Sequence, residues 1–354
     1  MSISSVNNLN SSLGKNEAFL ITSEENMRYI TGFPHSEGRV FITENEAIFF
    51  VDSRYIEAVT KSVSSCEVVL MTSFHKQLGE HIEKLGIKTV FTEAEGISVA
   101  DFSALCEKIP CEFKAEKADE LLTSLRRKKN EYEKNKILEA QAIAEKAFDH
   151  ILGFIKEGVT EREIALELDF FMLRNGAECV SFDTIAVSGK NSSLPHGVPS
   201  DKKIARGDFI TLDYGAVVDG YHSDMTRTVA VGELSSKQIE VYETVLSAQK
   251  KSLEALRAGI SGFDADKAAR DIIESAGYGS FFGHGTGHGV GLQIHESPRL
   301  SPKSKHVLEV GDVVTVEPGI YLPDEFGVRI EDMAFITENG FENLTKSPKS
   351  LIIL

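Results

Sequence analysis

Four acidic residues are the strongest candidates for chemistry in this sequence. They are Asp213, Asp224, Glu317 and Glu331, each beside a short apolar run in the second half of the chain. Gathered in a partly buried site, four carboxylates would repel one another, and such a cluster either takes up protons or binds cations. Metal binding is the simpler outcome. Four carboxylates exceed what one ion needs, whereas two ions about 3.5–4 Å apart can stabilise both the attacking and the departing atom of a hydrolysis.

An internal repeat is the reason to treat these acids as a set. The segment GDFITLDYG, which contains Asp213, is matched further on by GDVVTVEPG, which contains Glu317. In the same order, GYHSD ends at Asp224 and GVRIE ends at Glu331. A single Asp or Glu is more often a surface residue. Surface residues have no reason to recur in register, so the repeat favours a shared site.

The repeat extends beyond the acids. The segment HGVP begins at His196 and is matched by HESP, which begins at His295. Two helix-like runs, opened by GVT at residues 158–160 and by GIS at residues 259–261, precede them. We interpret this as a duplicated helix–strand unit packed about an approximate twofold axis, which would bring equivalent side chains together.

The glycine-rich segment FGHGTGHGVGL, residues 282–292, contains His284 and His288. Their i, i+4 spacing is that of a zinc-protease helix, but no Glu follows His284, and glycine costs about 1 kcal/mol per residue in a helix. An extended strand, in which glycine lets the backbone approach a ligand, fits better. His288 has no counterpart in the other copy and breaks the symmetry as a metal ligand would. Oxygen ligands with one nitrogen suit Mn²⁺, with Co²⁺, Fe²⁺ or Zn²⁺ as alternatives.

The elements that position these residues fall into two predicted domains, as expected for 354 residues. Residues 1–125 read as an α/β domain in which short apolar runs alternate with amphipathic helices, and this part has no cluster of His and carboxylates. Residues 126–354 begin with a basic run, Arg126 to Lys129, which we interpret as a solvated segment near the junction. A long helix from Glu131 to about Lys156 follows, and then the repeat.

Composition and charge exclude several classes of function. The formal net charge is −16 and basic residues form no broad patch, so nucleic acid and anionic membrane surfaces are not the expected partners. No apolar run is long enough to span a bilayer and no secretory signal is evident, so we expect a soluble cytoplasmic protein. The four cysteines lack CxxC spacing and are expected to be buried free thiols. No GxSxG segment is present, which disfavours a nucleophilic serine.

With these motifs in this order, the sequence resembles the proline-specific branch of the creatinase/aminopeptidase metallopeptidases, which includes aminopeptidase P and prolidase. The resemblance implies an α/β N-terminal domain that is followed along the chain by an α+β "pita-bread" catalytic domain with a pseudo-twofold repeat. It implies that Asp224 and Glu331 bridge two metal ions, that Asp213 chelates one, and that His288 and Glu317 complete the other. Glu317 would also accept the proton of the attacking water. The residues expected to hold substrate and the tetrahedral intermediate are His196, His284 and His295, and Arg329 matches the active-site arginine of the family near Glu331.

The function that the resemblance implies is metal-dependent hydrolysis of the Xaa-Pro bond at the N-terminus of dipeptides or oligopeptides, by a homodimer. A dedicated enzyme is physically reasonable, because an Xaa-Pro bond has no N–H to donate and the ring fixes φ. Two alternatives stay open: an activity like that of methionine aminopeptidases, which share the five ligands, and a non-catalytic binding protein on the same fold. The sequence leaves undecided the length of the substrate, its preferred first residue, the native metal and the oligomeric state.

Overall fold

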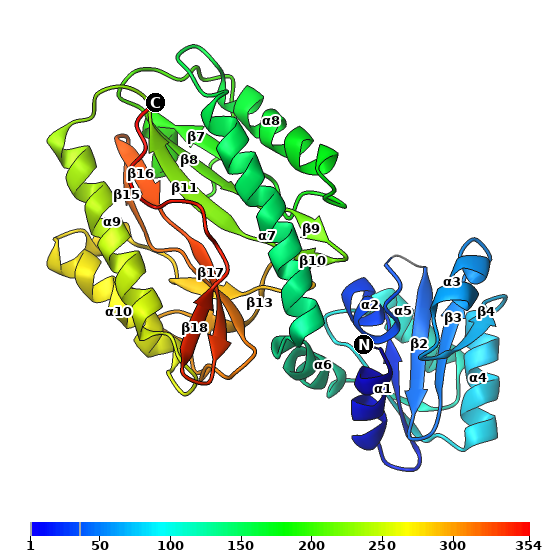
Figure 1. Cartoon of the computed structure of the whole chain (residues 1–354). Coiled ribbons are helices and arrows are strands. Elements are labelled where there is room, and N and C mark those ends of the chain that lie inside the picture. The colour runs from blue at the N-terminus through cyan, green and yellow to red at the C-terminus, as the bar shows by residue number, and fades with distance from the viewer. Residues whose placement is uncertain (1, 35–36) are drawn as a thin grey trace. The chain divides into compact units, whose positions relative to one another are not determined.

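The computed structural model describes residues 2–34 and 37–354 (Figure 1). The chain divides into two compact units, Met1–Arg126 and Arg127–Leu354. We describe each unit by itself. No helix of the described residues is long and apolar enough to cross a membrane. None of the four cysteines is fully buried, so the expectation of buried thiols was wrong.

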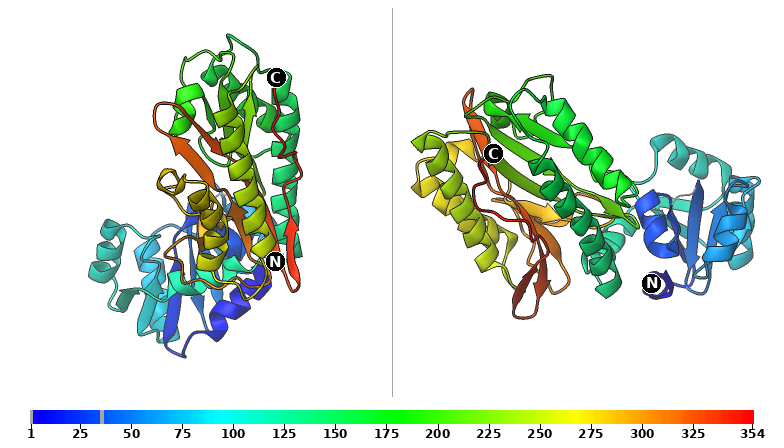
Figure 2. Two further views of the ribbon diagram at one scale, coloured as in Figure 1. Left: turned by 90° about the vertical axis from the view of Figure 1, so that its left-hand side faces the viewer. Right: turned by 45° about the horizontal axis from the view of Figure 1, so that its top comes forward.

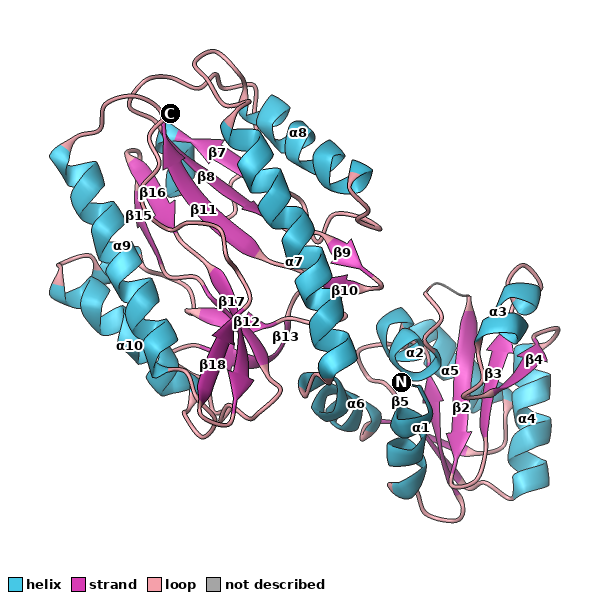
Figure 3. Cartoon of the chain, viewed as in Figure 1, coloured by secondary structure: helices cyan, strands magenta, loops and turns pink. Residues whose placement is uncertain are grey.

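The first unit is built on a mixed six-stranded sheet with the order β4-β3-β2-β1-β5-β6 (Figure 3). Side chains of β1 alternate between two apolar cores, with Phe19 and Ile21 on one face and Ala18 and Leu20 on the other. Helices cover both faces, so the predicted α/β class is confirmed. The strands are β1 Glu17–Ile21, β2 Gly38–Thr43, β3 Ala47–Val51, β4 Glu67–Leu70, β5 Thr89–Thr92 and β6 Glu112–Ala115. The helices are α1 Ser2–Ser11, α2 Glu24–Thr31, α3 Ile56–Ser62, α4 Phe74–Leu85, α5 Val99–Lys108 and α6 Ala118–Arg127.

The basic run Arg126 to Lys129 is solvated only in part: Lys128 is exposed, but two of the other residues are buried. Arg126 and Lys129 are buried, with 7% and 5% of their surface exposed. Arg126 donates to Asn26 at 2.8 Å and Lys129 to Glu296 at 2.9 Å. Each buried cation therefore has an oxygen partner far away in the sequence, which is the condition for burying a charge and which the local sequence cannot reveal.

The second unit consists of four long helices and two antiparallel sheets. The three-stranded sheet has the order β11-β8-β7 and the five-stranded sheet the order β13-β12-β14-β17-β18, while β9–β10 and β15–β16 are separate hairpins. The helices are α7 Glu131–Leu152, α8 Glu161–Arg174, α9 Ser236–Ala255 and α10 Gly262–Ser275, with 3₁₀ turns η1 Gly189–Ser193 and η2 Gly279–Phe281. The strands are β7 Ile185–Ser188, β8 Phe209–Tyr214, β9 Val217–Val218, β10 Tyr221–His222, β11 Met225–Ala230, β12 Gly287–Gly289, β13 Glu296–Leu300, β14 Val313–Val316, β15 Gly319–Leu322, β16 Phe326–Arg329, β17 Asp332–Thr337 and β18 Gly340–Asn343.

The predicted repeat is confirmed by the backbone. Helices α8 and α10 both have 14 residues, and the hydroxyls of Thr160 and Ser261 cap their N-termini. Gly158 and Gly259, which precede these caps, adopt φ values of 88° and 87°, a conformation that favours glycine. Equivalent isolated bridges also join Thr160 to Lys203 and Ser261 to Val307.

Paired helices pack on each copy of the repeat. Helices α7 and α8 share one apolar core with the β7–β8–β11 sheet, and α9 and α10 lie side by side over the other copy (Figure 2). The predicted long helix is α7, which begins at the capping box of Asn130 and Glu133 and ends before Gly153. The apolar positions expected at helical spacing are buried, although the last lies beyond the end of α7: Ile137, Ala140, Ala144, Phe148, Ile151 and Ile155. Between the two copies lie the ends of β8, β11, β14 and β17, where the acids are found.

Candidate metal centre

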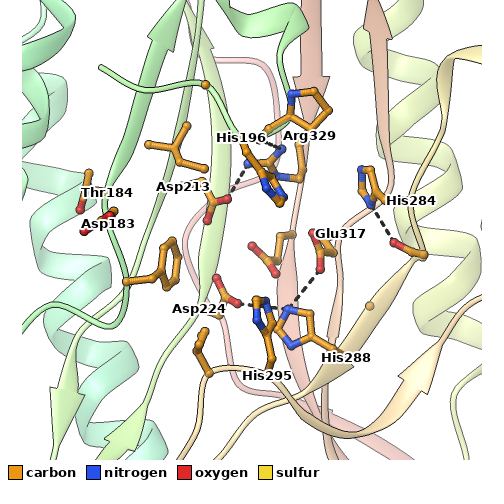
Figure 4. Close-up of a pocket in the computed structure, with 18 of the residues that line it drawn as sticks. Asp183, Thr184, His196, Asp213, Asp224, His284, His288, His295, Glu317 and Arg329 are labelled. Atoms are coloured by element: carbon orange, nitrogen blue, oxygen red, sulfur yellow. Dashed lines mark hydrogen bonds and ion pairs between the residues drawn. The ribbon is translucent and has the colours of Figure 1, made fainter. Parts of the chain in front are cut away.

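All nine residues predicted to form the site line one pocket of about 740 Å³ in the second unit (Figure 4). They are His196, Asp213, Asp224, His284, His288, His295, Glu317, Arg329 and Glu331. The two copies of the repeat contribute equivalent positions. Asp213 lies near the end of β8 and Glu317 directly follows β14, while Asp224 directly precedes β11 and Glu331 directly precedes β17.

His288 directs one nitrogen at the acids. Its Nδ1 lies 3.1 Å from the carbonyl oxygen of Gly289, which suits an Nδ1–H donor. The Nε2 atom lies 3.3 Å from Glu317 Oε1 and 3.6 Å from Asp224 Oδ2. One ligand atom each from Asp224, His288 and Glu331 lies within 4.8 Å of the other two, and all three residues are buried. This is the geometry of a cation site whose histidine is oriented from behind by a carbonyl.

Threonines and backbone groups hold the acids from behind. Thr226 Oγ1 donates to Glu331 Oε2 at 2.8 Å, and the N–H of Glu331 donates to the carbonyl of Thr226 at 3.1 Å. These bonds join the two copies of the repeat. On the other side, the N–H of Glu317 donates to the carbonyl of Thr286 at 2.8 Å, and Thr315 Oγ1 lies 3.3 Å from Glu317 Oε1.

Asp213 has one oxygen engaged and one free. Its Oδ2 accepts from Arg329 Nη2 at 2.5 Å, while its Oδ1 is buried and has no hydrogen-bond partner among residues 2–34 and 37–354. A buried acceptor without a partner is costly, and a cation would remove that cost. The residues present therefore fit divalent metal ions, with mostly oxygen donors and one imidazole nitrogen.

The electrostatics divide the acids into two groups. Burial, and then the charge of Asp213, raises the pKa of Asp224 well above its ordinary value, and burial with the charge of Asp224 does the same to the pKa of Glu331. Burial also opposes the ionisation of Glu317, but the hydrogen bond and charge of His288 outweigh it and lower the pKa of Glu317 to about 2. The first two acids thus favour a proton or a cation, whereas Glu317 remains a carboxylate.

A hydrogen-bonded chain runs from His284 to Asp213. Burial lowers the pKa of His284, so the ring is neutral, and its Nδ1 lies 2.8 Å from the carbonyl of Gly285. In that tautomer Nε2 accepts from the hydroxyl of Tyr321 at 2.9 Å, and the same hydroxyl accepts from Arg329 Nη1 at 2.8 Å. Burial raises the pKa of Tyr321 to about 12, which keeps the hydroxyl protonated. Both ring nitrogens of His284 are engaged within the protein.

Two histidines and an arginine are exposed on the pocket wall. The ring of His295 meets that of His288 edge-on at 4.4 Å, and burial together with the charges of His288 and Arg299 lowers the pKa of His295 to about 4. His196 lies on the segment after η1. Arg299, on β13, also lines the pocket and forms no ion pair with any described residue.

Sequence reasoning missed Arg299 and Tyr321. The signal for Arg299 was its position four residues after His295, next to the repeated HESP segment. Tyr321 stands four residues after Glu317, inside the VEPGIY motif, but its two partners come from β16 and the glycine-rich segment, and nothing in the local sequence indicates them.

The glycines near His288 serve close packing against protein backbone. A Cβ atom on Gly287 would lie 1.9 Å from the carbonyl oxygen of Thr315 on the adjacent β14. The predicted extended conformation is confirmed for β12, although the strand is only three residues long. The close approach is thus to a neighbouring strand, where the sequence suggested a ligand.

Comparisons with known proteins agree with this geometry. Residues 135–338 match the family described as metallopeptidase family M24, and residues 14–128 match the creatinase/prolidase N-terminal domain. The chain is 43% identical to the Xaa-Pro dipeptidase of Pyrococcus horikoshii, over 95% of this chain and 94% of that one. The solved structure of an Xaa-Pro dipeptidase from Bacillus anthracis superimposes with a TM-score of 0.97 at 44% identity, over 100% of both chains. That of an X-Pro aminopeptidase from Thermotoga maritima gives 0.90 at 38% identity, over 98% of this chain and 99% of that one.

Proposed function

Because this chain belongs to metallopeptidase family M24, with the creatinase/prolidase N-terminal domain and the pita-bread catalytic fold, we propose that it hydrolyses the Xaa-Pro bond of dipeptides. The observation that carries the proposal is one pocket lined by five acidic residues, four histidines and two arginines. The relatives named Xaa-Pro dipeptidase, which match over the full length, support the same substrate. The substrates are then short peptides with proline in second position.

The proposed cofactor is a pair of divalent ions, with Mn²⁺ as the native metal. Asp224 and Glu331 would bridge the ions, Asp213 would hold one of them, and His288 with Glu317 would complete the other. The unpartnered Oδ1 of Asp213 and the clustered Asp224, His288 and Glu331 support this assignment. When bound, such ions polarise the scissile carbonyl and lower the pKa of water, which makes hydrolysis feasible at neutral pH.

The protein groups have distinct proposed tasks. Glu317 stays ionised, so it can accept the proton that the attacking water releases. His295 is neutral and exposed in the pocket, and together with His196 it can donate an N–H to the oxyanion that develops on the carbonyl. Arg329 orients Asp213 directly, and it orients His284 through Tyr321. The ring of His284 is thus held in one position on the pocket wall by Gly285 and Tyr321.

Arg299 favours a dipeptidase over an aminopeptidase. A dipeptide carries a free carboxylate on its proline, and an unpaired guanidinium on the pocket wall is a suitable partner for it. Arg329 is less available, because Asp213 and Tyr321 already occupy it. Cleavage of longer Xaa-Pro peptides is the second candidate function, and the likeness to the Thermotoga maritima X-Pro aminopeptidase supports it.

A hydrolysis panel tests the proposal. The protein is treated with a chelator, dialysed and supplied with Mn²⁺, then given Xaa-Pro dipeptides, matched Xaa-Pro-Yaa tripeptides and Met-Ala. We expect hydrolysis of the dipeptides only when metal is returned, with a much lower kcat/KM for the tripeptides. Cleavage of Met-Ala alone would favour the methionine aminopeptidase alternative, and no hydrolysis of any peptide would favour a non-catalytic binding protein.

Three further assignments belong to the same proposal. Residues 1–125 form the creatinase-like domain and residues 126–354 the catalytic domain, close to the division between the compact units. The protein acts in the cytoplasm as a homodimer; this last assignment rests on the resemblance to the family, and sedimentation measurements test it.

A further inference from the structure

The loop that carries His196 is tied at both ends to one buried carboxylate. Glu161 is the first residue of α8 and has no exposed surface. Its Oε1 accepts from the backbone N–H of Ser188 at 2.7 Å and from that residue's hydroxyl at 2.9 Å. Its Oε2 accepts from the backbone N–H of Ser200 at 3.1 Å and from its hydroxyl at 2.6 Å. Ser188 and Ser200 bracket the segment that contains His196.

A third side chain fills the remaining positions around this carboxylate. The amide Nδ2 of Asn191, inside the loop, lies 3.1 Å from Glu161 Oε1 and 3.2 Å from Oε2. Among residues 2–34 and 37–354, the carboxylate of Glu161 therefore accepts only from neutral donors, all of which belong to the 188–200 loop. Ionised acceptors form hydrogen bonds roughly twice as strong as neutral ones, so this arrangement is an effective clamp.

The middle of the loop rests on the catalytic strands. The carbonyl of Pro195 accepts from Arg329 Nη1 at 3.1 Å, and Ser192 Oγ accepts from the N–H of Gly327 at 2.9 Å. His196 follows Pro195 directly and is exposed in the pocket. With its ends fixed by Glu161 and its centre fixed by Arg329, the loop has little freedom to move His196.

We propose that Glu161 is a positioning residue for the hydrolysis, acting through His196; this inference rests on the proposed function and on the role proposed for His196 within it. Glu161 touches no part of the pocket itself. Its effect is geometric, because a displacement of about 1 Å in a group that contacts the reacting atoms can cost roughly 100-fold in rate.

The second copy of the repeat contains a similar device and supplies a control. Asp266, buried in α10, accepts at Oδ1 from the N–H of Thr286 at 3.0 Å and from its hydroxyl at 2.9 Å. Asp266 also pairs with Arg270, which donates to the carbonyl of His284 at 2.8 Å. Asp266 thus fixes the segment of His284, whereas Glu161 fixes that of His196.

A double-mutant cycle on the full, metal-loaded chain tests the inference. Glu161→Gln keeps the shape but presents an NH₂ group to one of the two backbone N–H donors, and backbone donors cannot be reversed. We expect this substitution to lower kcat for an Xaa-Pro dipeptide by about tenfold or more. In a His196→Ala background the same substitution should cost less than about twofold, because the group it positions is gone.

The control is Asp266→Asn, whose effect should be the same with or without His196, because it acts on the other histidine. Equal losses for Glu161→Gln in both backgrounds would overturn the inference. If Glu161→Gln does not fold, Ser200→Ala takes its place in the cycle, since it removes one donor and keeps the carboxylate.

A measurement independent of catalysis completes the test. Amide hydrogen exchange in residues 189–199 should be faster in Glu161→Gln than in the unmodified chain, and exchange in residues 282–288 should be unchanged. Unchanged exchange in 189–199 would contradict the clamp. If the unmodified protein fails to cleave Xaa-Pro dipeptides, the proposed function fails, and the exchange measurement alone then decides whether Glu161 holds the loop.

Discussion

Asp224 and His288 are the individual residues on which the centre depends most directly. Both are buried, and both offer a donor atom to the same point as Glu331. We predict that Asp224→Asn or His288→Ala lowers kcat/KM for Xaa-Pro dipeptides by about 1,000-fold or more, because the loss of one donor disturbs the metal-dependent step. Kinetics and elemental analysis of the purified variants measure this.

The fold of Asp224→Asn should persist, since fewer like charges are then buried together. Circular dichroism checks that point. Asp201→Asn, which removes an exposed carboxylate paired only with Arg162, is the control and should behave as the unmodified protein. Near-normal activity of Asp224→Asn would remove that residue from the centre.

Arg299 is the side chain that we propose selects for substrate length. Arg299→Met should lower kcat/KM for Xaa-Pro by roughly ten- to a hundredfold, as expected for a lost charge-assisted hydrogen bond of about 1.5–3 kcal/mol. The loss should disappear for Xaa-Pro-amide, which has no carboxylate to bind. Comparing both substrates with both proteins measures the effect, and an equal loss on the amide would assign Arg299 a different role.

The residues of the candidate site differ in how far the sequence reveals them. Asp213, Asp224, Glu317 and Glu331 could be predicted because duplication placed them in register. Tyr321 could not, since its hydroxyl is defined by a histidine and an arginine from other elements. The sequence indicates neither the full burial of Glu161 nor the hydrogen bonds that Ser188, Asn191 and Ser200 donate to it.

The glycine-rich segment offers a test at the scale of an element. Gly287→Ala would place a Cβ atom 1.9 Å from the carbonyl oxygen of Thr315, so β12 and β14 must separate. We predict a loss of about 3 kcal/mol or more in the free energy of unfolding, together with loss of activity. Gly283→Ala is the matched control, because no atom lies within 4 Å of its added Cβ. Chemical denaturation of both variants measures the difference, and equal stability would contradict the packing role of Gly287.

The start of α7 provides a pH-dependent test. Glu133 accepts from the N–H of Asn130 and from the hydroxyl of Tyr221, both at 2.9 Å, and burial raises the pKa of its carboxyl. A carboxyl with a higher pKa in the folded state binds more protons when folded, so stability falls as pH rises from the unfolded pKa through the folded one.

Glu133→Gln removes this titration. We therefore predict that its melting temperature, relative to that of the unmodified protein, rises between pH 4 and pH 7. Thermal melts across this range measure the difference. A constant difference, or one that changes in the opposite direction, would contradict the assignment.

Elements with a clear periodic pattern could be predicted from the sequence, and others could not. The spacing of apolar residues predicts a helix over Phe74–Leu85 and a strand over Ala47–Val51, and α4 and β3 occupy these ranges. Strand β6 and helix α6 were missed: β6 is short, and α6 lies in a segment rich in charge whose buried face is narrow. The partners of its basic residues are distant in sequence, and no local pattern indicates them.

Metal removal tests the molecule as a whole. Ions that bind only the folded state stabilise it, by about 2.7 kcal/mol when their concentration is a hundred times Kd. We predict that chelation lowers the temperature of the unfolding transition of residues 127–354 and that added Mn²⁺ restores it. Calorimetry measures the shift. Asp224→Asn should show no such response, and an equal response in that variant would place the stabilising ion elsewhere.

Fold class and repeat could be predicted at this scale because one physical cause, duplication, leaves a long-range trace in the sequence. The hydrogen bond from Thr226 to Glu331, which joins the two copies, has no such trace in the sequence.

The pairing of equivalent strands around one pocket has an evolutionary consequence. After most duplications one copy is released from selection and can drift. Here each copy supplies only part of the proposed ligand set, so neither copy is redundant. The two copies instead differ in their side chains, one with two aspartates and the other with two glutamates and His288, so a substitution in either half changes the whole pocket.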